Sequence, residues 1–305
     1  MSAPAAIMNR PRGDLRIDEP LSRHTAWGIG GPAKRFYRPA DVDDLAFFLA
    51  GLPANESIFW LGLGSNVLVR DGGFEGTVIA PDALDAIALA GDDRVRVEAG
   101  VACPKVAKFC AARALGGCEF FAGIPGSVGG ALAMNAGAFG GETWDLVESV
   151  ETVARDGSRH RRAAGEYSVA YRSVTGPADE WFTLAELRLS PDAGGSAAVR
   201  IKELLRRRAQ TQPLGTRNCG SVFRNPPGDF AARLIEASGL KGAREGAAVV
   251  SEKHANFIIN TGGATAADVE SLIARVAERV AETSGVRLER EVQIVGRALA
   301  EGAQK

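Results

Sequence analysis

The stretch from Phe121 to Gly141, FAGIPGSVGGALAMNAGAFGG, limits the possible folds of this chain more than any other. Seven of its 21 residues are glycine, and most of the others are small. Glycine occurs where a backbone φ angle must be positive or where the backbone must approach another group closely. Such a segment exposes main-chain N–H groups, which together form a site for phosphate or pyrophosphate. One tight turn needs fewer glycines, so the stretch favours a loop that binds a phosphate-bearing cofactor.

A second glycine-rich loop, Gly62-Leu63-Gly64-Ser65-Asn66, follows the apolar, strand-like run 58–61. Its backbone N–H groups, the Ser65 hydroxyl and the Asn66 amide would all be available at one turn. Taken alone, the pattern is equally compatible with a simple connection between two strands. Together with the stretch 121–141, it predicts two loops that hold one extended cofactor from two sides.

The third informative stretch is NCGSVFRNPP, residues 218–227. Ser221 has no histidine near it in the sequence, and Phe223 replaces the second glycine of the G-x-S-x-G motif of hydrolases. Acyl transfer is therefore poorly supported. A hydroxyl can also donate a proton to a reactive carbanion, a role that requires no catalytic triad.

The composition indicates a soluble protein of about two domains. The 305 residues are 46% hydrophobic and 24% charged, which suffices for full cores. A net charge of −1 gives no reason to expect nucleic acid or an anionic membrane as a partner. No apolar run reaches the roughly 18 residues of a membrane span, and the N-terminal run, interrupted by Pro4, is too short for a signal peptide. We therefore expect a cytoplasmic protein.

The cysteines do not form a metal or disulfide pattern. No pair has CxxC spacing, and the three histidines do not cluster with any of them, which disfavours a zinc site and a disulfide framework. We expect the cysteines to be small apolar packing residues, and we expect no bound metal. They are Cys103, Cys110, Cys118 and Cys219.

The pattern of apolar residues predicts an α+β fold in two parts. Alternation favours strands at 94–99, 147–154 and 181–189, whereas residues 1–23 show no regular pattern. Helices are expected after Asp41 and from the capping box Thr265-x-x-Asp268 to Gly285. The linker 191–196 separates a domain at 23–195 from a second at 199–300. A last strand, 286–295, can pack back on the first domain.

The three loops, in this order, resemble the UDP-N-acetylenolpyruvoylglucosamine reductase family, the flavoenzymes of bacterial peptidoglycan synthesis. The resemblance extends from about Thr25 to Gly296, and no single motif would be specific without the others. It rests on residues 62–66, 123–130, 171–172, 218–226 and 288–292.

The resemblance implies an FAD-binding module of the vanillyl-alcohol-oxidase type, followed by a smaller α/β substrate domain. It further implies non-covalently bound FAD, NADPH as hydride donor, and reduction of UDP-N-acetylglucosamine enolpyruvate to UDP-N-acetylmuramate. We expect the chain to be a monomer. The motifs place the cofactor at Gly62, Gly64, Ser65, Asn66, Gly123, Ile124, Pro125, Gly126, Ser127, Gly129, Gly130 and Asn135.

By the same resemblance, Ser221 is the proton donor, and Arg172 and Glu291 lie at the substrate carboxylate. Glu289 shares a strand face with Glu291, so only the family motif distinguishes the two. The expected substrate-binding residues are Tyr171, Arg224, Asn225 and Lys253, with His254 and Asn256 as further candidates.

Two other functional classes remain open at this point: a flavin-dependent oxidase with the same cofactor fold, and a non-catalytic nucleotide-binding protein. No long insertion separates Gly141 from Leu189, so the chain resembles the shorter branch of the family, which lacks a substrate-covering tyrosine loop.

Overall fold

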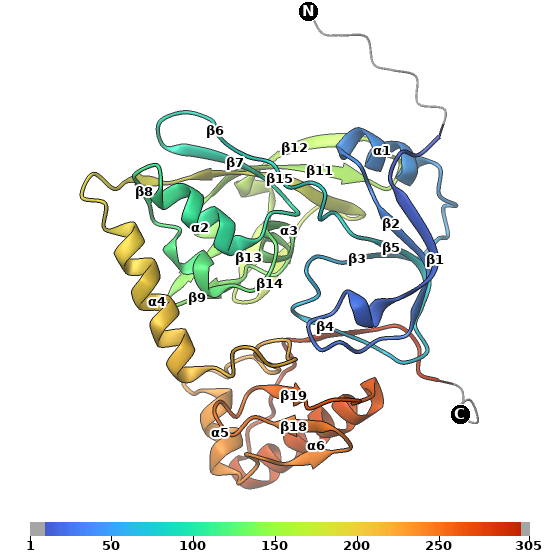
Figure 1. The fold of residues 1–305 in the computed structure, drawn as a ribbon, viewed down its shortest axis with the longest axis vertical. Coiled ribbons are helices and arrows are strands. Elements are labelled where there is room, and N and C mark those ends of the chain that lie inside the picture. Colours follow the sequence, from blue (N-terminus) through green and yellow to red (C-terminus); the bar gives the residue numbers. More distant parts are fainter. Residues whose placement is uncertain (1–9, 300–305) are drawn as a thin grey trace, which may run out of the picture. The chain divides into compact units, whose positions relative to one another are not determined.

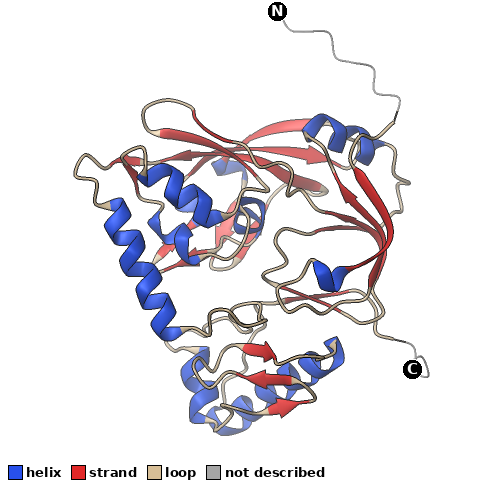
Figure 2. Cartoon of the chain, viewed as in Figure 1, coloured by secondary structure: helices blue, strands red, loops and turns tan. Residues whose placement is uncertain are grey.

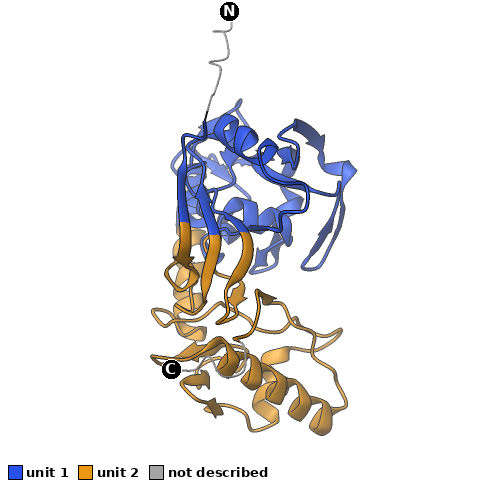
Figure 3. Cartoon of the chain, turned by 90° about the vertical axis from the view of Figure 1, so that its right-hand side faces the viewer, with its two compact units in different colours: residues 1–16, 35–62, 77–198 blue, residues 17–34, 63–76, 199–305 orange. Residues whose placement is uncertain are grey.

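A computed structural model describes residues 10–299, which fall into two compact units. Unit 1 contains residues 1–16, 35–62 and 77–198, and unit 2 contains residues 17–34, 63–76 and 199–305 (Figure 3). Most of the N-terminal run considered for a signal peptide, and the last residue of the domain predicted at 199–300, lie outside the described residues. The predicted α+β fold is confirmed.

The largest sheet of unit 1 has the order β12-β11-β15-β7-β6. Its strands are Arg159–Ala163, Val147–Ala154, Glu180–Arg188, Arg94–Glu98 and Ile87–Leu89 in that order. The strands expected at 94–99, 147–154 and 181–189 are thus present. Helices α2 (Cys103–Ala111) and α3 (Val128–Ala133) lie on one face of this sheet (Figure 1), where Val95 and Val97 are fully buried.

The rest of unit 1 consists of one helix, α1 (Val42–Ala50), and short elements. Asp41 caps α1 as expected, because its carboxylate accepts a hydrogen bond from the Asp44 N–H at 2.8 Å. The short strands are β8 (Leu115–Gly116), β9 (Gly137–Ala138), β10 (Gly141–Glu142), β13 (Ser168–Ala170), β14 (Ser173–Thr175) and β16 (Ser190–Pro191). The 3-10 helices η2 (Glu119–Gly123), η3 (Thr143–Asp145) and η4 (Ala164–Glu166) connect them.

A four-stranded sheet of order β1-β2-β5-β3 includes strands that begin in one unit and end in the other. Its strands are Asp14–Pro20, Pro32–Arg38, Phe74–Ile79 and Ile58–Trp60, and η1 (Leu21–Arg23) follows the first. The expectation that residues 1–23 lack regular structure was wrong for β1. Its first five residues are all exposed, so this edge strand has no buried alternation that a sequence pattern could show.

Unit 2 places three short strands beside two helices, as Figure 2 shows. The strands are β17 (Arg244–Glu245), β18 (Ala248–Val250) and β19 (Ile258–Asn260), and the helices are α5 (Ala231–Ala237) and α6 (Ala266–Ser284). Helix α6 begins at the predicted Thr265–Asp268 capping box and ends at Gly285, whose φ of +72° favours glycine. A third helix, α4 (Ala197–Thr211), precedes them in the chain.

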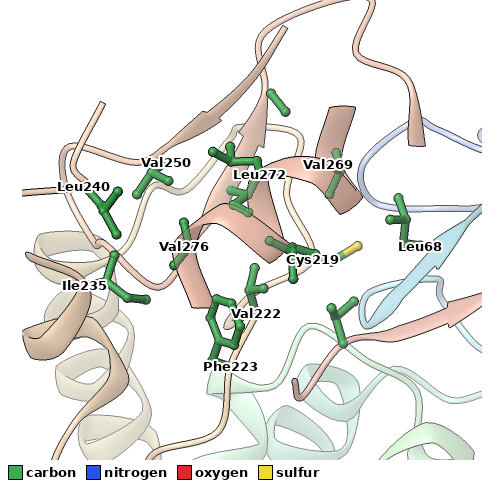
Figure 4. Close-up of a cluster of buried hydrophobic side chains, with 14 of the residues drawn as sticks. Leu68, Cys219, Val222, Phe223, Ile235, Leu240, Val250, Val269, Leu272 and Val276 are labelled. Atoms are coloured by element: carbon green, nitrogen blue, oxygen red, sulfur yellow. The ribbon is translucent and has the colours of Figure 1, made fainter. Parts of the chain in front are cut away.

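The last strand, β20 (Gln293–Val295), is shorter than the expected 286–295 and pairs in parallel with β4 (Val67–Val69). Residues 289–292 instead bond to the loop that contains Ser221, which removes them from the ladder. The core of unit 2 includes this loop: Cys219, Val222 and Phe223 are buried against Leu272 and Val276 of α6 (Figure 4). Core packing therefore fixes the residues before and after Ser221 in the chain.

Candidate active site

The glycine-rich loop of unit 1 ends at helix α3, which Ser127 caps. The Ser127 hydroxyl accepts a hydrogen bond from the Gly130 N–H at 3.4 Å. Two neighbouring N–H groups, of Val128 and Gly129, donate to the carbonyls of Val101 and Ala99 at 2.9 and 2.8 Å. These N–H groups of the loop therefore bond within the protein. Fewer N–H groups remain available to a ligand than the number of glycines suggests.

Several glycines of this region are required by packing inside the protein. A Cβ at Gly62 would lie 2.7 Å from the Ser127 Oγ, and one at Gly129 would lie 2.9 Å from the Ala99 Cβ. Gly130 differs: its Cβ would meet only the Ser127 Oγ, at 3.7 Å, and the residue is exposed. The protein itself does not require glycine there, so Gly130 marks a face that fits a closely approaching cofactor.

In unit 2, the loop 63–66 presents the donors expected for a phosphate. Gly64 has φ +62°, and a Cβ there would lie 2.0 Å from the carbonyl oxygen of His24. Among residues 10–299, no acceptor is found for the N–H groups of Leu63, Gly64 and Ser65 or for the Ser65 hydroxyl. Consecutive N–H groups of this kind form an anion-binding concavity, which fits the pyrophosphate of FAD.

The Asn135 side chain, expected to bind the cofactor, is used inside unit 1. Its amide donates to the Glu142 carboxylate at 2.7 Å and to the Ala170 carbonyl at 3.3 Å. Its Oδ1 accepts from the Trp144 N–H at 3.1 Å. Asn135 is almost fully buried and has a positive φ, so it shapes the loop.

Arg172 lies at the two-residue turn between β13 and β14 with φ +55°, a conformation that non-glycine residues rarely adopt. Its guanidinium donates to the carbonyls of Asn135 (3.3 Å) and Gly137 (2.9 Å) and lies 5.0 Å from the ring centre of Tyr171. Strained backbone persists where the surroundings hold it in place. The structure thus fixes a cation against the glycine-rich loop, with the half-exposed Tyr171 beside it.

Ser221 and Glu291 share one backbone frame in unit 2. The Val222 carbonyl accepts hydrogen bonds from the N–H groups of Glu291 (2.8 Å) and Val292 (3.3 Å). The Asn66 amide donates to the Glu291 carbonyl at 3.1 Å. Glu291 is partly buried, whereas the Glu289 side chain is 80% exposed. The difference in exposure therefore distinguishes Glu291 from Glu289, which their spacing in the sequence could not do.

The expected substrate-binding residues of unit 2 have structural partners as well. The Asn225 Oδ1 accepts from the N–H of Ala231, the first residue of α5, at 3.1 Å. The Lys253 Nζ donates to the Ala209 carbonyl in the last turn of α4 at 2.6 Å. Arg224 lies 4.0 Å from the Glu289 carboxylate. These contacts hold the polar groups in place.

Two residues of this region acquire a role that the sequence did not indicate. The Asn256 side chain, considered as a ligand contact, is bonded on both sides to Phe223. The Cys219 thiol donates to the carbonyls of Gly64 and Val67 at 3.5 and 3.4 Å, which ties the Ser221 loop to the cofactor loop. Burial raises the pKa of Cys219 to about 12, so the group stays a thiol.

Neither unit contains a metal site or membrane helix in its described part. No group of three or more histidine, cysteine, aspartate or glutamate residues within 10–299 could hold a metal ion. Over the same residues, no helix combines the length and hydropathy needed to cross a bilayer.

The two regions of the chain match two family models. Residues 33–162 match the FAD binding domain, and residues 212–295 match the C-terminal domain of UDP-N-acetylenolpyruvoylglucosamine reductase. The reductase of Alkalilimnicola ehrlichii is 58% identical over 94% of this chain and 96% of its own length. That of Methylococcus capsulatus is 60% identical over 95% of each.

The chain belongs to the UDP-N-acetylenolpyruvoylglucosamine reductase family. A crystal structure of the family member from Thermus caldophilus supports this, with a TM-score of 0.80 and 35% identity over 93% of this chain and 98% of that one. As a member of the UDP-N-acetylenolpyruvoylglucosamine reductase family, the chain is an FAD-dependent oxidoreductase. The predicted family, fold and cofactor are confirmed.

Proposed function

We propose that this chain reduces UDP-N-acetylglucosamine enolpyruvate to UDP-N-acetylmuramate for peptidoglycan synthesis, with NADPH as the reductant. Family membership and the FAD binding domain support the reaction class. The observation that carries the proposal is the backbone frame that joins the chain at Ser221 to Glu291 through Val222. A hydrogen bond from Asn66 to the main-chain carbonyl of Glu291 connects this frame to the cofactor loop.

Residues 62–66 and 123–130 would hold FAD, which in its reduced form would supply the hydride for the terminal carbon of the enolpyruvyl group. The adjacent carbon then bears negative charge that is shared with the carboxylate as an enolate. Ser221 donates the proton from Oγ to this carbon, which completes the reduction without a triad.

The two charged residues act on the substrate carboxylate. Arg172 stabilises the developing negative charge, and the carbonyls of Asn135 and Gly137 orient its guanidinium for this purpose. Glu291 orients the reacting group by hydrogen bonding. Tyr171, Arg224, Asn225 and Lys253 bind the rest of the substrate; the half-exposed Tyr171 supports this assignment.

We further propose that the chain belongs to the shorter branch of the family, acts as a monomer and is located in the cytoplasm. Short connections between successive elements from β10 to β15 support the first point.

The test is an anaerobic incubation of the flavin-loaded protein with NADPH and the enolpyruvyl substrate. We expect one UDP-N-acetylmuramate, identified by mass spectrometry, for each NADPH oxidised. NADPH oxidation that occurs only when oxygen is admitted would instead identify an oxidase. Absence of both reactions in flavin-loaded protein would leave a nucleotide-binding role and contradict the proposal.

A further inference from the structure

Asn256 binds the segment after Ser221 with three hydrogen bonds. Its main-chain carbonyl accepts from the Val222 N–H at 2.9 Å. Its Oδ1 accepts from the Phe223 N–H at 3.0 Å, and its Nδ2 donates to the Phe223 carbonyl at 2.8 Å. One buried side chain therefore pairs with both main-chain groups of Phe223, as a neighbouring strand would.

The opposite edge of the same segment is bonded to the chain around Glu291. The Val222 carbonyl accepts from the N–H groups of Glu291 and Val292, and the Arg224 N–H donates to the Glu289 carbonyl at 2.9 Å. Residues 222–224 thus lie between Asn256 on one side and residues 289–292 on the other. Any shift of this segment moves Ser221 relative to Glu291.

Water cannot replace these bonds easily, because the segment is part of the core. Asn256 is only 4% exposed, and Val222 and Phe223 are 1% and 2% exposed. A buried N–H or carbonyl that loses its partner carries the full cost of desolvation. Pairing with both main-chain groups of Phe223 requires one donor and one acceptor on a short side chain. Asparagine supplies both, whereas an ionised aspartate has no donor.

We propose that Asn256 is a positioning residue that fixes the Ser221 hydroxyl relative to Glu291 for proton delivery. This inference rests on the proposed function of Ser221. Asn256 itself does not touch the substrate in this account, because both polar atoms of its side chain are engaged by Phe223. Losing such a supporting contact typically costs about 10- to 100-fold in activity.

The test variant is Asn256→Asp, which keeps the shape and the acceptor but loses the donor to the Phe223 carbonyl. Stopped-flow absorbance on the flavin-loaded protein follows the two half-reactions separately. We expect flavin reduction by NADPH to stay near the wild-type rate. Reoxidation by the enolpyruvyl substrate should slow by about 10- to 100-fold at neutral pH.

The pH dependence adds a readout that a general loss of packing would not give. Protonation of the introduced carboxyl restores a donor to the Phe223 carbonyl, so the deficit in reoxidation should shrink as the pH falls. If the protein does not retain flavin with this substitution, Asn256→Ser tests the same loss of bonds without a buried charge. A reoxidation rate at the wild-type level in either flavin-loaded variant would overturn the inference.

Asn260→Asp is the matched control. Asn260 is also buried, and its side chain also has partners on both sides, but these are the Trp27 carbonyl (2.9 Å) and the N–H groups of Gly262 (2.9 Å) and Ala264 (3.1 Å). We expect this variant to lose stability while its reoxidation rate keeps the wild-type pH profile. An equal slowing in both variants would reduce Asn256 to a structural residue.

The double variant Ser221→Ala with Asn256→Asp separates this inference from the proposed function. If Asn256 acts through Ser221, adding Asn256→Asp to Ser221→Ala should slow reoxidation no further. If the double variant instead slows reoxidation by the product of the two single-variant factors, the positioning role of Asn256 is overturned, while Ser221 remains the proton donor. If Ser221→Ala alone reoxidises normally, the proton-donor role proposed for Ser221 fails first, although the substrate is still reduced.

Discussion

The side-chain amide of Asn66 donates a hydrogen bond to the main-chain carbonyl of Glu291, which lies 225 positions later in the chain. The neighbouring backbone repeats the connection, since the Gln293 N–H donates to the Asn66 carbonyl at 3.1 Å and β20 continues along β4. A residue of the cofactor loop thereby fixes the segment that carries the proposed substrate carboxylate contact.

This hydrogen bond predicts different roles for two adjacent loop residues, Ser65 and Asn66. Asn66→Ala should lower the free energy of unfolding of the flavin-free protein by about 1 kcal/mol, the typical net value of one hydrogen bond. Ser65→Ala is the control, because the Ser65 hydroxyl has no partner among residues 10–299. It should leave the urea midpoint unchanged and weaken FAD binding. Equal midpoints for the two variants would contradict the assigned role of Asn66.

Gly130 provides a test of cofactor placement that does not disturb the fold. Gly130→Leu adds a side chain where the protein leaves room, and leucine favours a helix over glycine by up to about 1 kcal/mol. We therefore expect flavin-free protein at least as stable as wild type, but with strongly reduced FAD content. Gly165→Ala, where a Cβ meets nothing within 4 Å, is the control. Gly130→Leu protein purified with full flavin would show that the cofactor lies elsewhere.

The sequence predicted correctly those elements that depend on contacts between residues close together in the chain. The Thr265–Asp268 capping box and Gly285 bounded α6 correctly, because both signals act within one helical turn. The alternation of Val95 and Val97 likewise marked β7, since one face of that strand is buried.

Elements that depend on distant partners were missed or misjudged. Strand β1 is nearly all exposed and is defined by its pairing alone. The sequence marked Asn256 only as a candidate substrate contact, and only the fold shows that it pairs with Phe223, 33 positions earlier. The glycine loops identified the cofactor region, but which glycines serve packing and which serve the ligand required the structure.

The cysteines should be inert in the native protein. All four are buried and none is in a disulfide; burial raises the pKa of Cys103 and Cys219 to about 12. Because the thiolate is the reactive form, native thiols should react with a disulfide reagent at least about a hundredfold more slowly than after unfolding in urea. Rapid reaction of one thiol in the native, flavin-loaded protein would reveal redox chemistry absent from this account.

His254 should make stability depend on pH. Burial lowers its pKa below the usual 6.5, and its Nδ1 has no hydrogen-bond partner within the described chain. Between the folded-state pKa and about 6.5 the unfolded chain binds more protons, so stability is lost as the pH falls through this window. His254→Phe should reduce that loss, measured by urea unfolding at several pH values. His160→Gln, at a histidine whose side chain is 34% exposed, is the control. Equal slopes for His254→Phe and wild type would contradict the prediction.

The most direct measurement of the central claim is stopped-flow absorbance of a flavin-loaded Ser221→Ala variant. NADPH should bleach its flavin at close to the wild-type rate, because that half-reaction delivers no proton to the enolpyruvyl carbon. Reoxidation by the enolpyruvyl substrate should slow by about 10²- to 10⁴-fold, the range for a positioned proton donor, and Ser221→Cys should recover part of the rate. A Ser221→Ala variant that is slow in bleaching by NADPH but normal in reoxidation by substrate would contradict the account.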